Sequence, residues 1–221
     1  MGWKGSKNQI WRGVKGQIME LNLSGIYESL RDRAKEAWAE GDMERVLGYM
    51  DSTRGLEFVI ANMPILVERN LFEKALIRAY IAPKINWSGF PFRYVKFLFD
   101  IADREDLIEA GDPLPGDGPF TVYRGVSGRG PARRIRGISW TASIKKAMWF
   151  STRLGREKPA VFEAGVDKSL VFAYWNQRNE SEFLCDIPRD FKLKKVWPEG
   201  GSLPWRGYPR HRPPEWLVKP K

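Results

Sequence analysis

The stretch AGDPLPGDGP, residues 110–119, separates two parts of the chain whose apolar residues follow different patterns. Its density of Gly, Pro and Asp cannot continue a helix, because proline lacks the donor N–H and glycine disfavours the helical backbone. Before it, apolar residues recur at helical spacing, and after it come short β-branched and aromatic segments. The sequence therefore predicts an α+β protein with a helical N-terminal half followed by a β-rich domain.

The N-terminal part, residues 1–111, is expected to be a helical region. Ser24 is expected to cap a first helix, and three further segments carry the same periodicity: MERVLGYM (43–50), LFEKALIRAYIA (71–82) and FRYVKFLFDIA (92–102). Its aromatic and methionine side chains are typical of a helical core. No catalytic constellation is evident in this part.

The second domain is expected to begin at residue 112 and to extend to about 199, or to about 221 with its tail. The predicted strands span residues 120–126, 137–141, 160–166, 170–175, 181–187 and 191–197, and the helix-like segment SIKKAMWFSTRL lies between the second and third.

Composition limits the chemistry that the chain can perform. One cysteine, Cys185, excludes an internal disulfide framework, and one histidine, His211, leaves no His/Cys cluster for a metal site. The same scarcity argues against a Ser-His-Asp or Cys-His arrangement, so catalysis would rest on carboxylates, Arg, Ser or Tyr. The net charge of +10 favours an anionic partner.

Nothing in the sequence predicts attachment to a membrane. The N-terminal MGWKGSKNQIWRG has charges where a signal peptide needs an apolar run, and the most apolar stretch, LEFVIANMPILV, is short and is interrupted by Pro64. We therefore expect a protein that acts in a cytoplasm, either its own or that of a host into which it is delivered.

The stretch NESEFLCD, residues 179–186, places two glutamates at the start of a predicted buried strand. Successive side chains of a strand point to opposite faces, so Glu180 and Glu182 are expected to share one face. Two neighbouring carboxylates destabilise a protein unless a cation meets them, which indicates that this pair has a positively charged partner.

Three short elements of the β-rich part, taken in order, carry a resemblance to a known family. They are a strand with Tyr123-Arg124-Gly125, a strand with Ser139-Trp140-Thr141 that precedes a helix, and the Glu-x-Glu strand. This order resembles the Arg-Ser-Glu class of mono-ADP-ribosyltransferases, which includes clostridial actin-modifying toxins and vertebrate arginine-specific enzymes. The resemblance covers roughly residues 118–197, about a third of the chain. It implies two packed sheets around an NAD cleft, with NAD as substrate and no metal.

The resemblance also implies which residues bind NAD. Arg124 would contact the phosphates and the adjoining ribose, since its planar donor fork matches phosphate oxygens. Ser139 would brace the nicotinamide-ribose pocket, and Tyr123 and Thr141, in the same motifs, are assigned to NAD binding as well. The family motif is Ser-Thr-Ser, whereas this chain has Ser-x-Thr, which makes the match looser. Phe150 lies near the position of an aromatic that stacks on nicotinamide, although a core role is the alternative.

The glutamates are implied to perform the transfer. Glu182 would bond the 2′-hydroxyl of the nicotinamide ribose and stabilise the positive charge that develops as nicotinamide leaves. Glu180 would orient and deprotonate the acceptor, which in the family is most often a protein arginine. The loop YWNQRN, residues 174–179, stands where the family recognises its acceptor.

Two other functions remain open at this stage. The same pocket would modify RNA or DNA if the +10 charge and the Arg/Trp-rich tail, residues 200–221, bind a nucleic acid. Alternatively, the chain is a non-catalytic basic nucleic-acid-binding module whose glutamates are ordinary surface charge. The sequence does not distinguish a toxin, a phage factor and a regulator, and it does not determine the oligomeric state.

Overall fold

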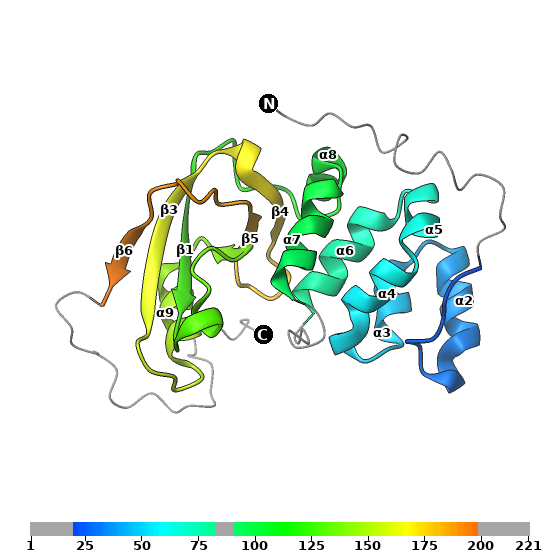
Figure 1. The fold of residues 1–221 in the computed structure, drawn as a ribbon. Helices are drawn as coiled ribbons and strands as arrows, with labels where there is room; N and C mark the ends of the chain where they lie inside the picture. The colour runs from blue at the N-terminus through cyan, green and yellow to red at the C-terminus, as the bar shows by residue number, and fades with distance from the viewer. Residues whose placement is uncertain (1–19, 83–90, 199–221) are drawn as a thin grey trace. The chain divides into compact units, whose positions relative to one another are not determined.

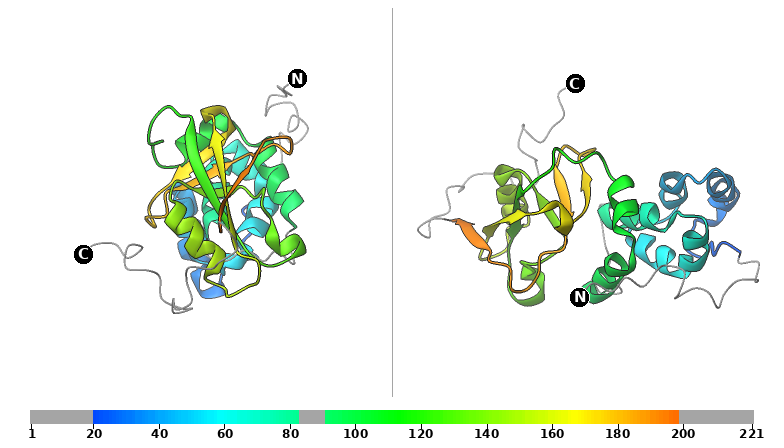
Figure 2. Two further views of the ribbon diagram at one scale, coloured as in Figure 1. Left: turned by 90° about the vertical axis from the view of Figure 1, so that its left-hand side faces the viewer. Right: turned by 90° about the horizontal axis from the view of Figure 1, so that it is seen from above.

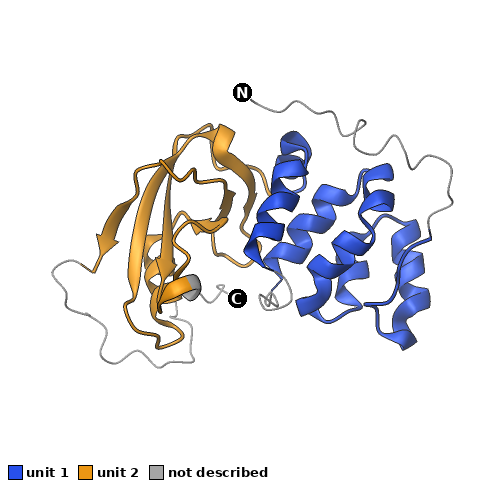
Figure 3. Ribbon diagram, in the orientation of Figure 1, with its two compact units in different colours: residues 1–110 blue, residues 111–221 orange. Residues whose placement is uncertain are grey.

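The computed structural model describes residues 20–82 and 91–198. The chain divides into two compact units, residues 1–110 and residues 111–221 (Figure 3). The sequence expectation placed this division one residue later, after residue 111. The first unit is helical and the second contains the sheet, so the predicted α+β class is confirmed.

The described residues of unit 1 form short helices, several of which pack against α6 (Phe72–Ile81), and this helix is buried along most of its length. The apolar stretch around Pro64 is two helices, because the proline takes one of the first positions of α5, where its missing N–H is harmless. No helix in the described ranges is long and apolar enough to cross a membrane. The helices are α2 (Arg31–Ala39), α3 (Met43–Gly48), α4 (Gly55–Ala61), α5 (Met63–Glu68), α6 (Phe72–Ile81), α7 (Phe92–Ile101) and α8 (Arg104–Glu109).

The prediction that Ser24 caps the first helix is wrong. Helical structure begins with a 3-10 turn, η1 (Glu28–Leu30), and continues directly into α2. The segment before it is held in another way, because the Asn22 N–H donates to Asn62 Oδ1 at 2.7 Å and Ile26 pairs with Met50 in an isolated bridge. These long-range contacts hold the backbone at Ser24 outside a helix.

The described part of unit 2 contains one antiparallel sheet with the strand order β4-β5-β2-β1-β3-β6 (Figure 1). A single helix, α9 (Ile144–Thr152), connects β2 to β3. Every predicted strand is present, and β1 and β3 have the expected bounds. The strands are β1 (Phe120–Val126), β2 (Ser139–Thr141), β3 (Ala160–Val166), β4 (Val171–Trp175), β5 (Glu182–Cys185) and β6 (Lys194–Trp197).

The expectation of two packed sheets is wrong for the described residues, whose six strands belong to one sheet. The reason is that β1 pairs on both sides, with β3 along its whole length and with β2 through the pair Tyr123 and Thr141. Two three-stranded halves are thus joined by a short pairing. Both halves contribute to one apolar cluster on one face of the sheet, which contains Phe120, Val122, Trp140, Ala164, Val166, Val171, Phe183, Cys185 and Ile187.

Helix α9 packs on the opposite face of the sheet, against β1 and β3 (Figures 1 and 2). Ala147 of α9 is buried there in a cluster with Val161 and Trp197, and Tyr123 packs against the same cluster. Gly125 allows the helix to approach this closely, because any side chain at that position would overlap the carbonyl oxygen of Ala147. The face covered by α9 is the one on which the candidate site lies.

Candidate functional site

A row of aligned residues crosses the sheet on the α9 face. Glu182 is the Cα partner of Thr141 across β5 and β2, and Thr141 is the partner of Tyr123 across β2 and β1. The structure therefore brings three predicted site residues into one row, although the sequence places them on three separate strands. From one edge to the other the row is Trp175, Glu182, Thr141, Tyr123, Glu163 and Lys194.

Glu182 is a buried carboxylate that is held by hydrogen bonds. Its side chain lies next to that of Trp175, which is its partner on β4, and the residue is 7% exposed. Ser139 lies two residues from Thr141 and thus on the same face, and its Oγ donates to Oε1 of Glu182 at 2.5 Å. Burial raises the pKa of Glu182, while the hydrogen bond from Ser139 and the charge of Arg178 act in the opposite direction.

The two glutamates meet through a loop and not through strand alternation. Strand β5 begins at Glu182, so Glu180 precedes it, and the expected strand over 181–187 is shorter at both ends. Ser181 has φ 47° and Asn179 has φ 54°, in the left-handed region, which turns the chain and ends the extended conformation. Both carboxylates nevertheless point to one cation.

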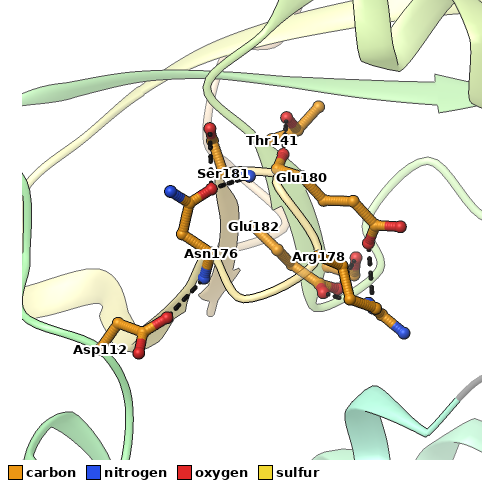
Figure 4. Close-up of polar contacts among 8 residues, drawn as sticks. Asp112, Thr141, Asn176, Arg178, Glu180, Ser181 and Glu182 are labelled. Atoms are coloured by element: carbon orange, nitrogen blue, oxygen red, sulfur yellow. Dashed lines mark hydrogen bonds and ion pairs between the residues drawn. The ribbon is translucent and has the colours of Figure 1, made fainter. Parts of the chain in front are cut away.

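That cation is Arg178 (Figure 4). Its Nη2 lies 2.9 Å from Oε2 of Glu180 and 3.1 Å from Oε2 of Glu182. One guanidinium nitrogen therefore contacts both carboxylates, which offsets their mutual repulsion. The Arg178 side chain is 40% exposed, so solvent reaches the group that bridges the pair.

The loop that carries Arg178 is held in shape by its own hydrogen bonds. The Asn176 N–H donates to Oδ2 of Asp112 at 2.6 Å, and Oδ1 of Asn176 accepts from the Ser181 N–H at 3.0 Å (Figure 4). Thr141 adds a third bond, because its Oγ1 donates to the carbonyl oxygen of Glu180 at 2.6 Å. The same hydroxyl accepts from the Ser143 N–H at 3.1 Å, at the start of α9. Thr141 thus connects β2, the glutamate loop and α9.

A lysine from α9 also reaches this loop. Lys146 is 7% exposed, and its Nζ lies 3.5 Å from Oγ of Ser181. Burial lowers the pKa of Lys146, and the negative charge of Glu180 acts against this shift. The lysine therefore places a second positive group beside the glutamate pair.

Phe150 lies on α9, next to Trp149, with their ring centroids 5.0 Å apart. The guanidinium of Arg153 stacks on both rings, at 5.1 Å from the centroid of Trp149 and 4.8 Å from that of Phe150. Burial lowers the pKa of Arg153, and the negative charge of Glu180 opposes this shift, so Arg153 lies within electrostatic range of Glu180. Both rings are half-buried, and the stacking of Phe150 on nicotinamide stays a prediction.

Arg124 is placed differently from the other predicted residues. It follows Tyr123 along β1, so it points to the face of the apolar cluster that contains Val122. Its Nε donates to the carbonyl oxygen of Arg134 at 3.0 Å and its Nη1 donates to that of Ser139. Gly137 leaves room for the guanidinium, because a Cβ at that position would overlap it. The structure thus places Arg124 against the segment that leads into β2, and its contact with NAD stays a prediction.

Sequence reasoning missed the cations of the site. Arg178 stands two residues before Glu180 and four before Glu182, and this spacing was the available signal. No comparable signal marks Lys146 or Arg153, because a lysine and an arginine on an amphipathic helix are usually solvated. Within the described ranges, no group of three or more His, Cys, Asp or Glu side chains is placed to hold a metal ion.

The raised pKa of Glu182 predicts a pH-dependent stability. An acid whose pKa is higher in the folded state binds more protons there, so the free energy of unfolding falls as pH rises from the unfolded pKa, near 4.5, through the folded pKa. Glu182→Gln removes this contribution. We expect the stability of the wild type to decline relative to Glu182→Gln over that window, as measured by urea denaturation at several pH values. A difference that is independent of pH, or that grows in favour of the wild type, would contradict the assignment.

The site therefore contains a buried, hydrogen-bonded carboxylate, a second carboxylate beside it, and three cations within contact or electrostatic range. Such a group suits chemistry in which positive charge develops on a substrate and a proton is removed from another. Comparisons of the chain with protein-family models, with curated proteins and with solved structures found no significant match, so the functional argument rests on these residues.

Proposed function

We propose that the protein is a mono-ADP-ribosyltransferase, which transfers ADP-ribose from NAD to an acceptor and releases nicotinamide. The acceptor that suits the site best is an arginine of a target protein. The observation that carries this proposal is the arrangement around Glu182, whose buried carboxylate accepts a hydrogen bond from Ser139 and shares a guanidinium with Glu180.

Glu182 suits the departure of nicotinamide. When the bond between C1′ of the ribose and the nicotinamide nitrogen breaks, the electron pair leaves with nicotinamide and positive charge develops on the sugar. A carboxylate that is held in place and shielded from water stabilises that charge strongly, because it needs no reorganisation. Ser139 fixes the orientation of this carboxylate through Oε1, which leaves Oε2 directed toward Arg178. In the proposed reaction the same oxygen would accept a hydrogen bond from the 2′-hydroxyl of the nicotinamide ribose.

Glu180 suits the activation of an arginine acceptor. A protonated guanidinium is a poor nucleophile and must lose a proton to attack the sugar. Glu180 already binds one guanidinium, that of Arg178, at 2.9 Å, which supports its ability to hold another. Thr141 holds the backbone of Glu180 from β2, so the second carboxylate is positioned relative to the first.

The charge of unit 2 supports an anionic substrate. Residues 1–110 contain sixteen Lys and Arg and sixteen Asp and Glu, so the entire excess of +10 lies in residues 111–221. Such a field attracts the pyrophosphate of NAD. It attracts nucleic acid equally, and this observation keeps RNA or DNA as the second candidate acceptor.

The proposal is tested by incubating the full chain with NAD labelled on its adenylate half, in a cell extract and with free nicotinamide measured in parallel. We expect nicotinamide release together with label on macromolecules. Label that protease removes and nuclease leaves identifies a protein acceptor, whereas the reverse pattern moves the acceptor to nucleic acid. If the chain released no nicotinamide and transferred no label, the transferase function would be excluded.

A further inference from the structure

The guanidinium of Arg178 already occupies the place that an acceptor arginine would take. Its Nη2 lies 2.9 Å from Glu180, the carboxylate suited to remove a proton, and 3.1 Å from Glu182, the carboxylate suited to stabilise the sugar. An ordinary ion pair needs only one of these contacts, whereas an acceptor nitrogen must lie close to both carboxylates, because one takes its proton and the other holds the sugar that it attacks. Figure 4 shows both carboxylates directed to this one side chain.

The loop presents Arg178 in a fixed position. Asn176 binds Asp112 through its backbone N–H and Ser181 through its side chain, and Asn179 donates to the carbonyl oxygen of Asn176 at 2.7 Å. The backbone at Asn179 is left-handed, a conformation that asparagine tolerates better than most residues. The guanidinium is thus ordered before any substrate arrives, yet its side chain is 40% exposed and accessible.

We propose that Arg178 is itself an acceptor, so that the protein ADP-ribosylates its own glutamate loop. This inference rests on the proposed function and names a modification site for it. In the step, the bond between C1′ and the nicotinamide nitrogen breaks and its electron pair leaves with nicotinamide. A bond forms between C1′ and Nη2 of Arg178, and one guanidinium proton passes to Glu180 and then to solvent. NAD and the arginine are the only reactants, and no oxidation occurs.

Because acceptor and carboxylates belong to one chain, the reaction is intramolecular. Groups held in contact react with effective concentrations far above those of free partners. The fraction of chains labelled per unit time is therefore independent of protein concentration. Modification also places a bulky, anionic ADP-ribose where an external acceptor would bind, so self-labelled protein loses transfer to other arginines.

The experiment uses the purified full chain with adenylate-labelled NAD and no other protein, followed by peptide mapping by mass spectrometry. We expect label on the peptide that contains Arg178, at a rate unchanged by about tenfold dilution. In Arg178→Lys, which keeps the positive charge but has no guanidino group, we expect loss of this label. Arg189→Lys is the matched control, because Arg189 is an exposed arginine of unit 2 outside the site, and it is expected to label as the wild type does.

The wild-type map decides the inference, whatever the folding of the variants. Label found only on other arginines overturns the modification of Arg178 and leaves the transferase function standing. The same conclusion follows if the chain carries no label of its own but still releases nicotinamide, or still modifies added agmatine, a free guanidino compound. Self-labelling that slows in proportion to dilution overturns the intramolecular reaction. Absence of nicotinamide release and of all label means that the proposed function fails, and self-modification fails with it.

Discussion

Glu182→Gln is expected to lower NAD turnover by about a hundredfold to a thousandfold while unit 2 remains folded. The size of this effect follows from the position of the carboxylate, which is buried and fixed by Ser139. Among the residues that the structure describes, Glu180 is the acid beside it. Glutamine keeps the shape and still accepts the Ser139 hydrogen bond, but it brings no negative charge to the sugar. Nicotinamide release under saturating NAD measures the effect.

The control for this variant is Glu157→Gln. Glu157 is an exposed glutamate of the same unit whose partner is Arg129, so its loss removes one surface charge and no buried one. We expect its turnover to match that of the wild type. The thermal melt of Glu182→Gln should not fall below that of the wild type at neutral pH, because burial raises the pKa of Glu182 and the wild type then bears the cost of a buried charge that glutamine lacks. Full turnover in Glu182→Gln would remove Glu182 from the reaction.

Local sequence pattern predicted the elements of unit 2 well. The bounds of β1 and β3 agree with expectation, because each is a continuous run of strand-forming residues limited by turn residues. Residues Tyr123, Thr141 and Glu182 were linked only by a resemblance, and the structure aligns them in one row. That alignment depends on register between strands that are distant in sequence, which periodicity does not contain.

The parts that sequence did not predict depend on tertiary contacts. The single sheet follows from pairing of β1 on both sides, and pairing partners are not encoded in the pattern of one strand. Glu180 was expected to share one strand face with Glu182, but the left-handed backbone at Asn179 and Ser181 keeps Glu180 outside β5, which begins at Glu182. Arg178 was noted only as part of a loop, since the fold of that loop, with Asn176 held by Asp112, determines where its guanidinium lies. The missed features are thus those set by long-range hydrogen bonds.

Gly125→Ala is expected to destabilise unit 2 by about 3 kcal/mol, at the upper end of the usual range for overpacking. A Cβ at this position would overlap the carbonyl oxygen of Ala147 and lie 2.8 Å from the backbone nitrogen of Ser151. Both are backbone atoms of α9, so no side-chain rotation relieves the contact and the helix must move away from β1. That movement also displaces Lys146 from the glutamate loop, so activity is expected to fall with stability.

The matched control is Gly165→Ala on β3, directly opposite Thr121 of β1 in the same sheet. Gly165 is exposed, and a Cβ there meets no atom within 4 Å, so the change in stability should stay within about 0.5 kcal/mol. Because the chain has two units, native-state hydrogen exchange of the β1 and β3 amides reports on unit 2 alone. Equal protection of these amides in the two variants would mean that α9 is free to shift at no cost, and that the close approach at Gly125 does not hold the site together.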